Sequence, residues 1–177
     1  MSTREDLLRA AADYLGRRPN ATQDEIASAV GVSRATLHRH FAGRSALMTA
    51  LEELAIAEMS EVLATVRLHE GPADEALRRL VIACEPISPY LALLYSQSQE
   101  DPDTCIEVWS EIDSTITELF LRGQQDGVFR PELPAAWLTE TFYSLVAATD
   151  WSIRAGRVAA RDGTRLITDL LLNGVKQ

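Results

Sequence analysis

Two helix-start signals separated by a glycine stand close together in residues 22–47, and they limit the possible folds of this chain more than any other feature. Thr22 and Glu25 have the spacing of a capping box, in which each side chain binds the other residue's free backbone N–H. Gly31 can adopt the left-handed conformation of a tight turn, and Ser33 is a good N-cap for the next helix. The stretch therefore predicts two short helices joined by a turn, followed by the start of a third helix.

Proline and glycine divide the rest of the chain into segments whose apolar residues recur with helical spacing. In residues 3–17, for example, Leu7, Ala11 and Leu15 share one face. The absence of Gly and Pro between residues 43 and 71 predicts one long helix. Further helices are expected over residues 72–84, 90–98, 102–124, 135–155 and 159–172. The chain is therefore predicted to be all-α, with about nine helices.

The composition is that of an ordinary globular protein, with 46% hydrophobic and 24% charged residues. No apolar run approaches the ~18 residues of a membrane-spanning helix, and the first residues are charged and lack the apolar core of a signal peptide. We therefore expect a cytoplasmic protein without a membrane partner. In that compartment the two cysteines, Cys84 and Cys105, are expected to be reduced and buried.

The charge is divided unevenly along the chain, although the net value of −9 argues at first against nucleic acid. Residues 1–50 contain seven arginines and five acidic residues, whereas the remaining residues contain ten basic and twenty-one acidic ones. A basic end on an acidic body is typical of a protein in which one region approaches phosphates and another does not.

Residues 22–41 provide the parts that a helix needs in order to enter the major groove of DNA. The small Ala27 lets the two helices approach closely. The apolar residues of a shared core would be Ile26, Val30, Val32, Leu37 and Phe41, and the side chains left for the exposed surface of the second helix are Arg34, Ala35, Thr36, His38, Arg39 and His40. Arginine can bind guanine or phosphate, and alanine can contact a thymine methyl group. The alternative interpretation is an ordinary helical hairpin with solvated charges.

The same residues resemble the motif of the tetracycline-repressor (TetR) family of bacterial transcription regulators. The family pattern is present as EIA from Glu25, GVS from Gly31, TLHRHF from Thr36 and RSAL from Arg44. The chain length, the later helices and the loop GVFRPELP also resemble the family. The resemblance implies an N-terminal helix-turn-helix DNA-binding domain in residues 1–46, and a larger helical effector-binding and dimerisation domain in residues 47–177.

By position, the resemblance also implies which side chains contact DNA. Base edges would be contacted by Arg34, Ala35 and Arg39, and phosphates by Thr22, Gln23, Thr36, His38 and Arg44, with Ser33 and His40 completing the candidate set. Two residues differ from the family pattern. His38 replaces a tyrosine and adds a group that can titrate near neutrality, and Arg44 replaces a lysine and allows a bidentate phosphate contact.

The two final helices, residues 135–172, are broadly apolar, and such helices at a chain end need a partner. The resemblance implies a homodimer in which they form a four-helix bundle with the same helices of a second copy. Two copies would also present two recognition helices to a near-palindromic operator of double-stranded DNA. The alternative is that these apolar faces belong to the core of a single chain.

Asp113 and Asp150 each interrupt an apolar row of a predicted helix, where a carboxylate needs a partner or water. Either could line a ligand cavity and face a cationic or hydrogen-bonding effector. The candidate ligand-binding residues are Tyr90, Tyr95, Trp109, Asp113, Tyr143 and Asp150. The alternative is that each acid pairs with an arginine such as Arg122 or Arg154, or lies at the dimer interface.

The sequence therefore predicts a ligand-responsive transcriptional regulator, expected to be a repressor, that binds DNA as a homodimer and is released by an unknown small-molecule effector. We expect no enzyme activity, cofactor or metal, because the sequence shows no nucleophile with a paired base, no phosphate loop and no metal-ligand cluster. Two other classes stay open. One is a helical enzyme or small-molecule-binding protein whose N-terminal helices are structural, and the other is a dimeric protein–protein module.

Overall fold

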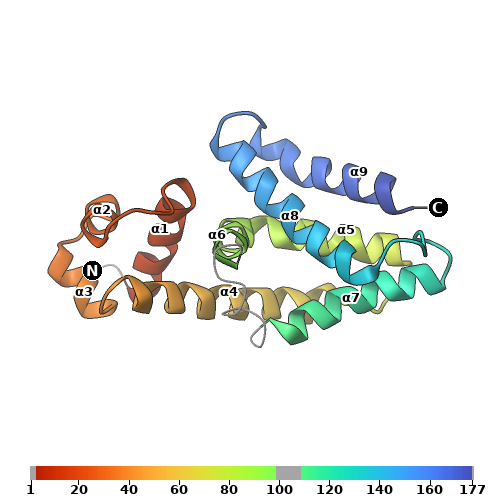
Figure 1. Cartoon of the computed structure of the whole chain (residues 1–177), viewed down its shortest axis with the longest axis horizontal. Helices are drawn as coiled ribbons and strands as arrows, with labels where there is room; N and C mark the ends of the chain where they lie inside the picture. The colour runs from red at the N-terminus through yellow and green to blue at the C-terminus, as the bar shows by residue number, and fades with distance from the viewer. Residues whose placement is uncertain (1–2, 99–108, 177) are drawn as a thin grey trace.

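The computed structural model describes residues 3–98 and 109–176, and this part of the chain is helical, as the sequence predicts (Figure 1). Pairing between extended segments is limited, within those two ranges, to one isolated bridge between Phe129 and Lys176. The elements are α1 (Arg4–Arg17), α2 (Gln23–Ala29), α3 (Arg34–His40), α4 (Arg44–Val66), α5 (Ala73–Cys84), the 3₁₀-helix η1 (Glu85–Ile87), α6 (Ser88–Ser98), α7 (Ser110–Gln125), α8 (Ala135–Arg154), the 3₁₀-helix η2 (Ala160–Asp162) and α9 (Gly163–Val175).

Helices α1, α2 and α3 form an N-terminal unit at one end of the molecule, and α4 leads from this unit into the larger helical body (Figure 1). Thr22 forms the predicted capping box at the start of α2, and the Ser33 hydroxyl accepts a hydrogen bond from the backbone of α3. Gly31 has a φ of 74°. A 2.9 Å hydrogen bond from the Val32 N–H to the Ala27 carbonyl closes the turn. The prediction of two short helices joined by a tight turn is therefore confirmed.

A small apolar core fixes the angle between α2 and α3. Ile26, Leu37 and Phe41 are fully buried in it, together with leucines from α1 and the start of α4. Val30 and Val32, which the sequence also assigns to this core, are only half-buried and pack against its edge. Because Leu37 points inward, most other side chains of α3 face outward.

The long helix α4 ends earlier than the sequence predicts. The lack of Gly and Pro favours a helix as far as Gly71, but α4 ends at Val66, and Arg67 adopts a left-handed conformation with a φ of 52°. Arg79 and Arg122 donate hydrogen bonds to carbonyl groups of the turn that follows. Donors from the next helix, α5, and from the more distant α7 thus stabilise the turn, and the sequence pattern of α4 does not contain that information.

The prolines between α5 and α6 also act differently from the prediction. The sequence predicts a break over Pro86 and Pro89, whereas η1 continues directly into α6, which begins at Ser88 rather than at Tyr90. Proline is tolerated in the first turn of a helix because the N–H that it lacks has no helical partner there. The expected start of the next helix at Pro102 lies outside the described residues.

In the body, α8 and α9 pack against each other and α9 also packs on α5 (Figure 1). The loop before α8 is anchored by Phe129, whose ring is fully buried and lies 5.9 Å from the Phe120 ring. This ring occupies the space that a side chain at Gly123 would need. The glycine in α7 is therefore required by close packing and not by an unusual backbone conformation.

Two expectations from composition can be compared with the structure. None of the helices in the described residues is long and apolar enough to span a bilayer. Cys84 has a buried free thiol, and burial raises its pKa to about 12. Cys105 lies outside the described residues.

Candidate nucleic-acid interface and ligand site

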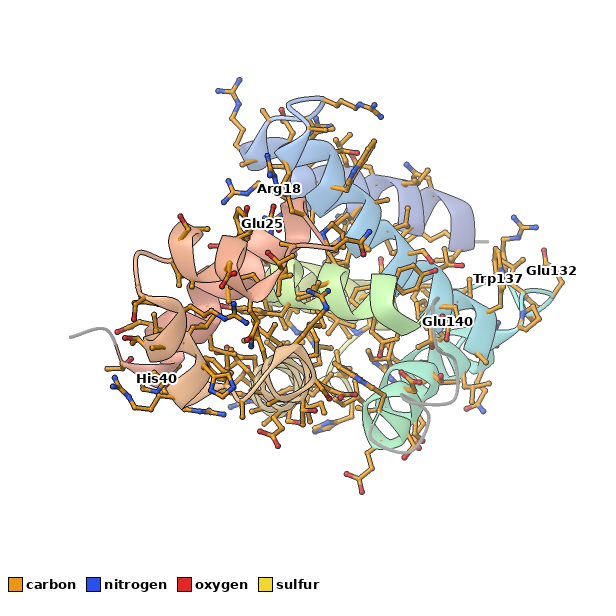
Figure 2. All side chains as sticks on the ribbon, turned by 60° about the vertical axis from the view of Figure 1, so that its left-hand side comes forward. Arg18, Glu25, His40, Glu132, Trp137 and Glu140 are labelled. Carbon is orange, nitrogen blue, oxygen red and sulfur yellow. The ribbon has the colours of Figure 1, made fainter. Side chains whose placement is uncertain are left out.

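Helix α3 presents polar side chains to the outside of the N-terminal unit. The exposed residues are Arg34, Ala35, His38 and Arg39, and the partly covered ones are Thr36 and His40. Figure 2 shows His40 far from Arg18 and Glu25, which lie together at the other end of this unit. Arg34, at the opposite end of α3 from His40, pairs with Asp24 in the first turn of α2, so the exposed face of α3 adjoins the start of that helix.

The hydroxyl groups at the two helix starts are already engaged in capping. Thr22 Oγ1 accepts a hydrogen bond from the Glu25 N–H at 3.3 Å and donates one to the Glu25 carboxylate at 2.9 Å. Hydrogen bonds from the Thr22 backbone and side chain hold the pKa of Glu25 below its usual range. Ser33 Oγ accepts from the Thr36 N–H at 3.1 Å and lies 2.9 Å from Thr36 Oγ1. These hydroxyls cap α2 and α3. A hydroxyl that contacted a phosphate would also have to keep its capping hydrogen bond.

The two arginines of α3 are weakly committed to the rest of the protein. Arg34 forms an ion pair with Asp24 at 3.2 Å, in which the side chains are 70% and 61% exposed. Such an exposed pair contributes roughly 0–1 kcal/mol, so Arg34 can exchange Asp24 for a nucleic-acid group at little cost. For Arg39 the described part of the chain provides neither a hydrogen bond nor an ion pair. Both guanidinium groups are therefore available to an anionic partner.

Arg44 and Gln23, two predicted phosphate contacts, also bind backbone carbonyls of the N-terminal unit. The Arg44 guanidinium donates hydrogen bonds to the carbonyls of Pro19 and Ala21, the latter at 2.7 Å. Gln23 Nε2 donates to the Phe41 carbonyl at 3.4 Å. Arg44 thus holds the loop between α1 and α2 against the start of α4. Because a guanidinium has five N–H donors, it can keep these two bonds and still face a phosphate.

Arg4 is a further cation beside α3 that the sequence interpretation did not include. Its Cζ atom lies 5.1 Å from the centre of the Phe41 ring, and Phe41 is the C-cap residue of α3. The signal in the sequence was a basic residue in the first turn of a helix, where the helix dipole disfavours positive charge. A nearby polyanion would attract the positive charge of Arg4 and so offset its unfavourable interaction with the helix dipole.

In the body, Asp113, Tyr143 and Glu140 form a polar group between α7 and α8, which we call the Asp113 cluster. The Tyr143 hydroxyl donates a 2.7 Å hydrogen bond to Asp113 Oδ1. Burial, followed by the charge of Asp113, raises the pKa of both Tyr143 and Glu140. Glu140 was missed at the sequence level, although it lies one helical turn before Tyr143. Two close carboxylates beside a protonated phenol suit a cationic or hydrogen-bond-donating ligand.

The other aromatic candidates have different partners, although the Trp109 carbonyl accepts a 2.9 Å hydrogen bond from the Asp113 N–H. The Tyr90 hydroxyl accepts a hydrogen bond from Arg9 of α1 at 3.3 Å, and burial raises the pKa of Tyr90. Tyr95 Oη lies 2.6 Å from Ser144 Oγ. Trp109 is half-buried and packs against the core. Within the predicted set, the structure therefore brings Asp113 and Tyr143 into direct contact, while Tyr90 takes part in the contact between the body and α1.

Asp150 is paired with an arginine, as the alternative interpretation predicts. Its Oδ2 atom accepts a 2.6 Å hydrogen bond from Nε of Arg154, one helical turn further along α8. Arg154 also donates to the Asp13 carbonyl at 3.0 Å, so it connects α8 to α1. Asp150 lies on a pocket that none of the three residues of the Asp113 cluster lines. The two aspartates singled out by the sequence thus belong to different places.

Helices α8 and α9 expose large apolar side chains. Trp137 and Trp151 are 55% and 53% exposed on α8, and Leu166 and Leu170 are 38% and 62% exposed on α9. Figure 2 shows Trp137 at the outer edge of α8. Exposed apolar residues of this size on two adjacent helices indicate an association surface.

Comparisons with known proteins agree with this arrangement. The family model described as "Bacterial regulatory proteins, tetR family" matches residues 7–51. The chain is 33% identical over 173 residues to NfxB, an HTH-type transcriptional regulator of Pseudomonas aeruginosa, with 96% of this chain and 92% of NfxB covered. It is 31% identical over 162 residues to LfrR, an HTH-type transcriptional repressor of Mycolicibacterium smegmatis, with 91% of this chain and 80% of LfrR covered.

A solved structure has the same fold over almost the whole chain. The TetR-like regulator LfrR from Mycobacterium smegmatis, in complex with proflavine, aligns with a TM-score of 0.75 and 25% identity, covering 98% of this chain and 96% of that chain. Because the relatives are transcriptional regulators, the hypothesis of a helical enzyme is not supported. The recognition motif, the fold and the identity to these relatives show that the chain belongs to the TetR family of bacterial transcriptional regulators.

Proposed function

We propose that this protein is a homodimeric repressor that binds a near-palindromic DNA operator and is released by a cationic small-molecule effector. The surface of α3 carries the proposal, because Ser33 caps this helix and Leu37 anchors it while its two arginines stay exposed. Regulators of this family bind DNA operators and usually act as dimers with small-molecule effectors. Operator binding would place the protein in the bacterial cytoplasm.

In this proposal the residues of the N-terminal unit divide into two roles. Arg34, Ala35 and Arg39 contact base edges in the major groove. Phosphates are contacted by Thr22, Gln23, Ser33, Thr36, His38, His40 and Arg44, and Arg4 is added to them because it lies beside α3. Residues 1–46 act as the DNA-binding domain and residues 47–177 as the effector-binding and dimerisation domain.

The second copy is proposed to bind through α8 and α9. Trp137, Trp151, Leu166 and Leu170 support this interface, because they are the large apolar residues exposed on these two helices. A two-fold axis between the copies would set the separation of the two α3 helices. Disruption of this surface by Leu170→Glu is expected to give monomers that bind the operator far more weakly.

The effector is proposed to be an aromatic cation bound at the Asp113 cluster. Asp113 is half-buried and Glu140 is exposed, and the two carboxylates interact with each other, so together they favour a compensating positive charge. The complex of the similar protein LfrR with proflavine, a cationic aromatic dye, supports this class of ligand. The effector would bind preferentially to the dimer conformation whose α3 helices do not fit the operator, so it lowers operator affinity by its differential affinity for the two states. Helix α4 runs across the boundary at residues 46–47 and would transmit the change.

The DNA-binding half of the proposal is tested by Arg34→Ala/Arg39→Ala in a gel-shift titration, with an operator selected from random duplexes. Each base contact is worth about 1–3 kcal/mol, so the double variant should bind at least ~30-fold more weakly. The matched control is Arg78→Ala/Arg161→Ala, which removes two exposed arginines from the body. Equal affinity of the two double variants would contradict the assignment of α3.

The effector half is tested by fluorescence titration with proflavine. Asp113→Asn should weaken binding about tenfold or more, since a charged hydrogen-bonding group contributes ~1.5–3 kcal/mol, whereas Glu118→Gln on the exposed side of α7 should not. The raised pKa of Glu140 means that it becomes neutral at a higher pH than an ordinary glutamate. Wild-type affinity should therefore fall as the pH is lowered through that raised pKa, and Glu140→Gln should flatten the dependence. Unchanged binding in Asp113→Asn would exclude this site.

A further inference from the structure

A pocket lies between α5, α8 and α9, and has a volume of about 200 Å³. Its lining residues are Val81, Cys84, Glu85, Ser88, Val146, Thr149, Asp150, Ile153, Ala160, Gly163, Thr164 and Ile167. Neither the Asp113 cluster nor the exposed apolar residues of α8 and α9 contribute to it. Since pockets for drug-sized ligands have volumes of about 300–1,000 Å³, this one is suited to a smaller molecule.

The chemistry of the pocket favours a small cation with an apolar body. Its walls carry valine and isoleucine side chains, its charged members are Glu85 and Asp150, and none of its lining residues is basic. The Glu85 carboxylate accepts a 2.6 Å hydrogen bond from the Thr164 hydroxyl, which orients it across the gap between α5 and α9. Asp150 is buried, and a buried carboxylate needs a positive partner.

The positive partner of Asp150 comes from outside the pocket. Arg154 contacts Asp150 through Nε, while its NH1 and NH2 groups face the carbonyl and carboxylate of Asp13 at 3.0 and 3.7 Å. Its guanidinium also lies against Gly16, since a Cβ built there would be 3.1 Å from Arg154 Cζ. Arg154 thus connects the Asp150 carboxylate, which lines the pocket, to α1 of the N-terminal unit.

We propose that this pocket is a second ligand site, for a small organic ammonium ion whose charge is balanced by Asp150 and Glu85. Its apolar substituents would contact Val146 and Ile167, and its charge would compete with Arg154 for the Asp150 carboxylate. Occupancy of the pocket would therefore weaken the attachment of Arg154 to α8 and loosen α1. The loosening of α1 matters for DNA binding only if the proposed function is correct, because α1 belongs to the proposed DNA-binding unit.

Ligand binding is measured by isothermal titration calorimetry on the full chain without DNA, with choline as the probe and its uncharged isostere 3,3-dimethylbutanol as the control. We expect saturable choline binding at least tenfold tighter than that of the isostere. Asp150→Asn should weaken it about tenfold. Ala160→Trp, which fills the pocket from its exposed rim without altering a charge, should abolish it, and Arg154→Met should strengthen it by removing the competing cation. Glu118→Gln, on the exposed side of α7, should have no effect.

Equal binding of choline and the isostere would overturn the choice of a cation, and unchanged binding in Ala160→Trp would overturn the location. Loss of choline binding in Asp113→Asn, with Ala160→Trp unaffected, would assign the ligand to the Asp113 cluster instead. The link to α1 is measured separately by operator gel shift, where choline should lower the affinity of the wild type and not that of Ala160→Trp. A bound choline that leaves operator affinity unchanged would contradict the link and leave the site in place.

Discussion

Two arginine–aspartate pairs in this molecule have the same chemistry and opposite surroundings. In the N-terminal unit, the side chains of Arg34 and Asp24 are 70% and 61% exposed, whereas those of Arg154 and Asp150 in the body are 15% and 10% exposed. Water solvates the side chains of Arg34 and Asp24 whether or not they pair, so the pair adds little stability. Removal of one partner of the second pair leaves a charge away from water. The same side chain can thus be free for an external partner in one region and committed to the fold in the other.

This difference extends to the rest of the two regions. On the exposed face of α3, arginine guanidinium groups point into solvent, while in the body Arg79 and Arg122 bind backbone carbonyls and Tyr143 binds Asp113. A surface that meets a polyanion needs charges that can change partners without disturbing the fold. Inside the body, polar groups need hydrogen-bonded partners, because an unpaired polar group away from water is costly.

The largest difference in the free energy of unfolding is expected between the variants Asp150→Asn and Asp24→Asn. Asp150→Asn should lower the free energy of unfolding by about 3 kcal/mol, because the largely buried Arg154 loses the nearer of its two carboxylate partners, and Asp24→Asn should lower it by less than ~1 kcal/mol. Urea denaturation of both variants and the wild type measures the two losses. Similar losses in the two variants would mean that burial does not distinguish the pairs.

A second comparison separates stability from DNA binding. Arg122→Met removes the charged donor of two hydrogen bonds to the carbonyls of Leu68 and Gly71, and should cost about 2 kcal/mol of stability while the folded protein keeps its operator affinity. Arg34→Met should show the reverse, with stability within ~0.5 kcal/mol of the wild type and operator affinity reduced about tenfold. Each variant is measured by urea denaturation and by gel shift. The comparison fails if both variants lose the same property.

The smallest effect is expected at the cap of α2. Thr22→Ala should cost about 1 kcal/mol, because it removes the N-cap hydroxyl. The pKa of Glu25 is lowered in the folded state, so its contribution to stability is present above its unfolded pKa and is lost as the pH falls through the lowered value. Urea midpoints measured from pH 6 downward should therefore decline more steeply for the wild type than for Glu25→Gln. Parallel pH profiles would show that the capping box does not perturb Glu25.

The N-terminal unit was predictable because its signals are local. The capping residues Thr22 and Ser33 and the turn residue Gly31 lie within a few positions of the groups that they serve, and all three act as predicted. The inward position of Leu37 follows from helical periodicity alone. Local chemistry therefore fixed the helix starts and the outward face of α3.

The body was less predictable because its decisive contacts join distant segments. The end of α4 at Val66 depends on Arg79 and Arg122. Arg79 lies on the next helix, α5, and Arg122 lies further along the chain on α7. Sequence periodicity marked Asp113 and Asp150 as unusual, but their partners differ: Tyr143 comes from another helix, and Arg154 from the next turn of the same helix. The sequence therefore indicates which polar residues interrupt apolar faces, and the fold determines their partners.

Whether two copies of α3 bind DNA together can be measured by selecting bound duplexes from a random pool with the wild-type protein. A homodimer should enrich two inverted half-sites whose centres lie about 10–10.5 base pairs apart, or a multiple of that spacing, because one face of the duplex must meet both helices. Enrichment of a single half-site, or of no sequence at all, would contradict operator binding by a homodimer through α3.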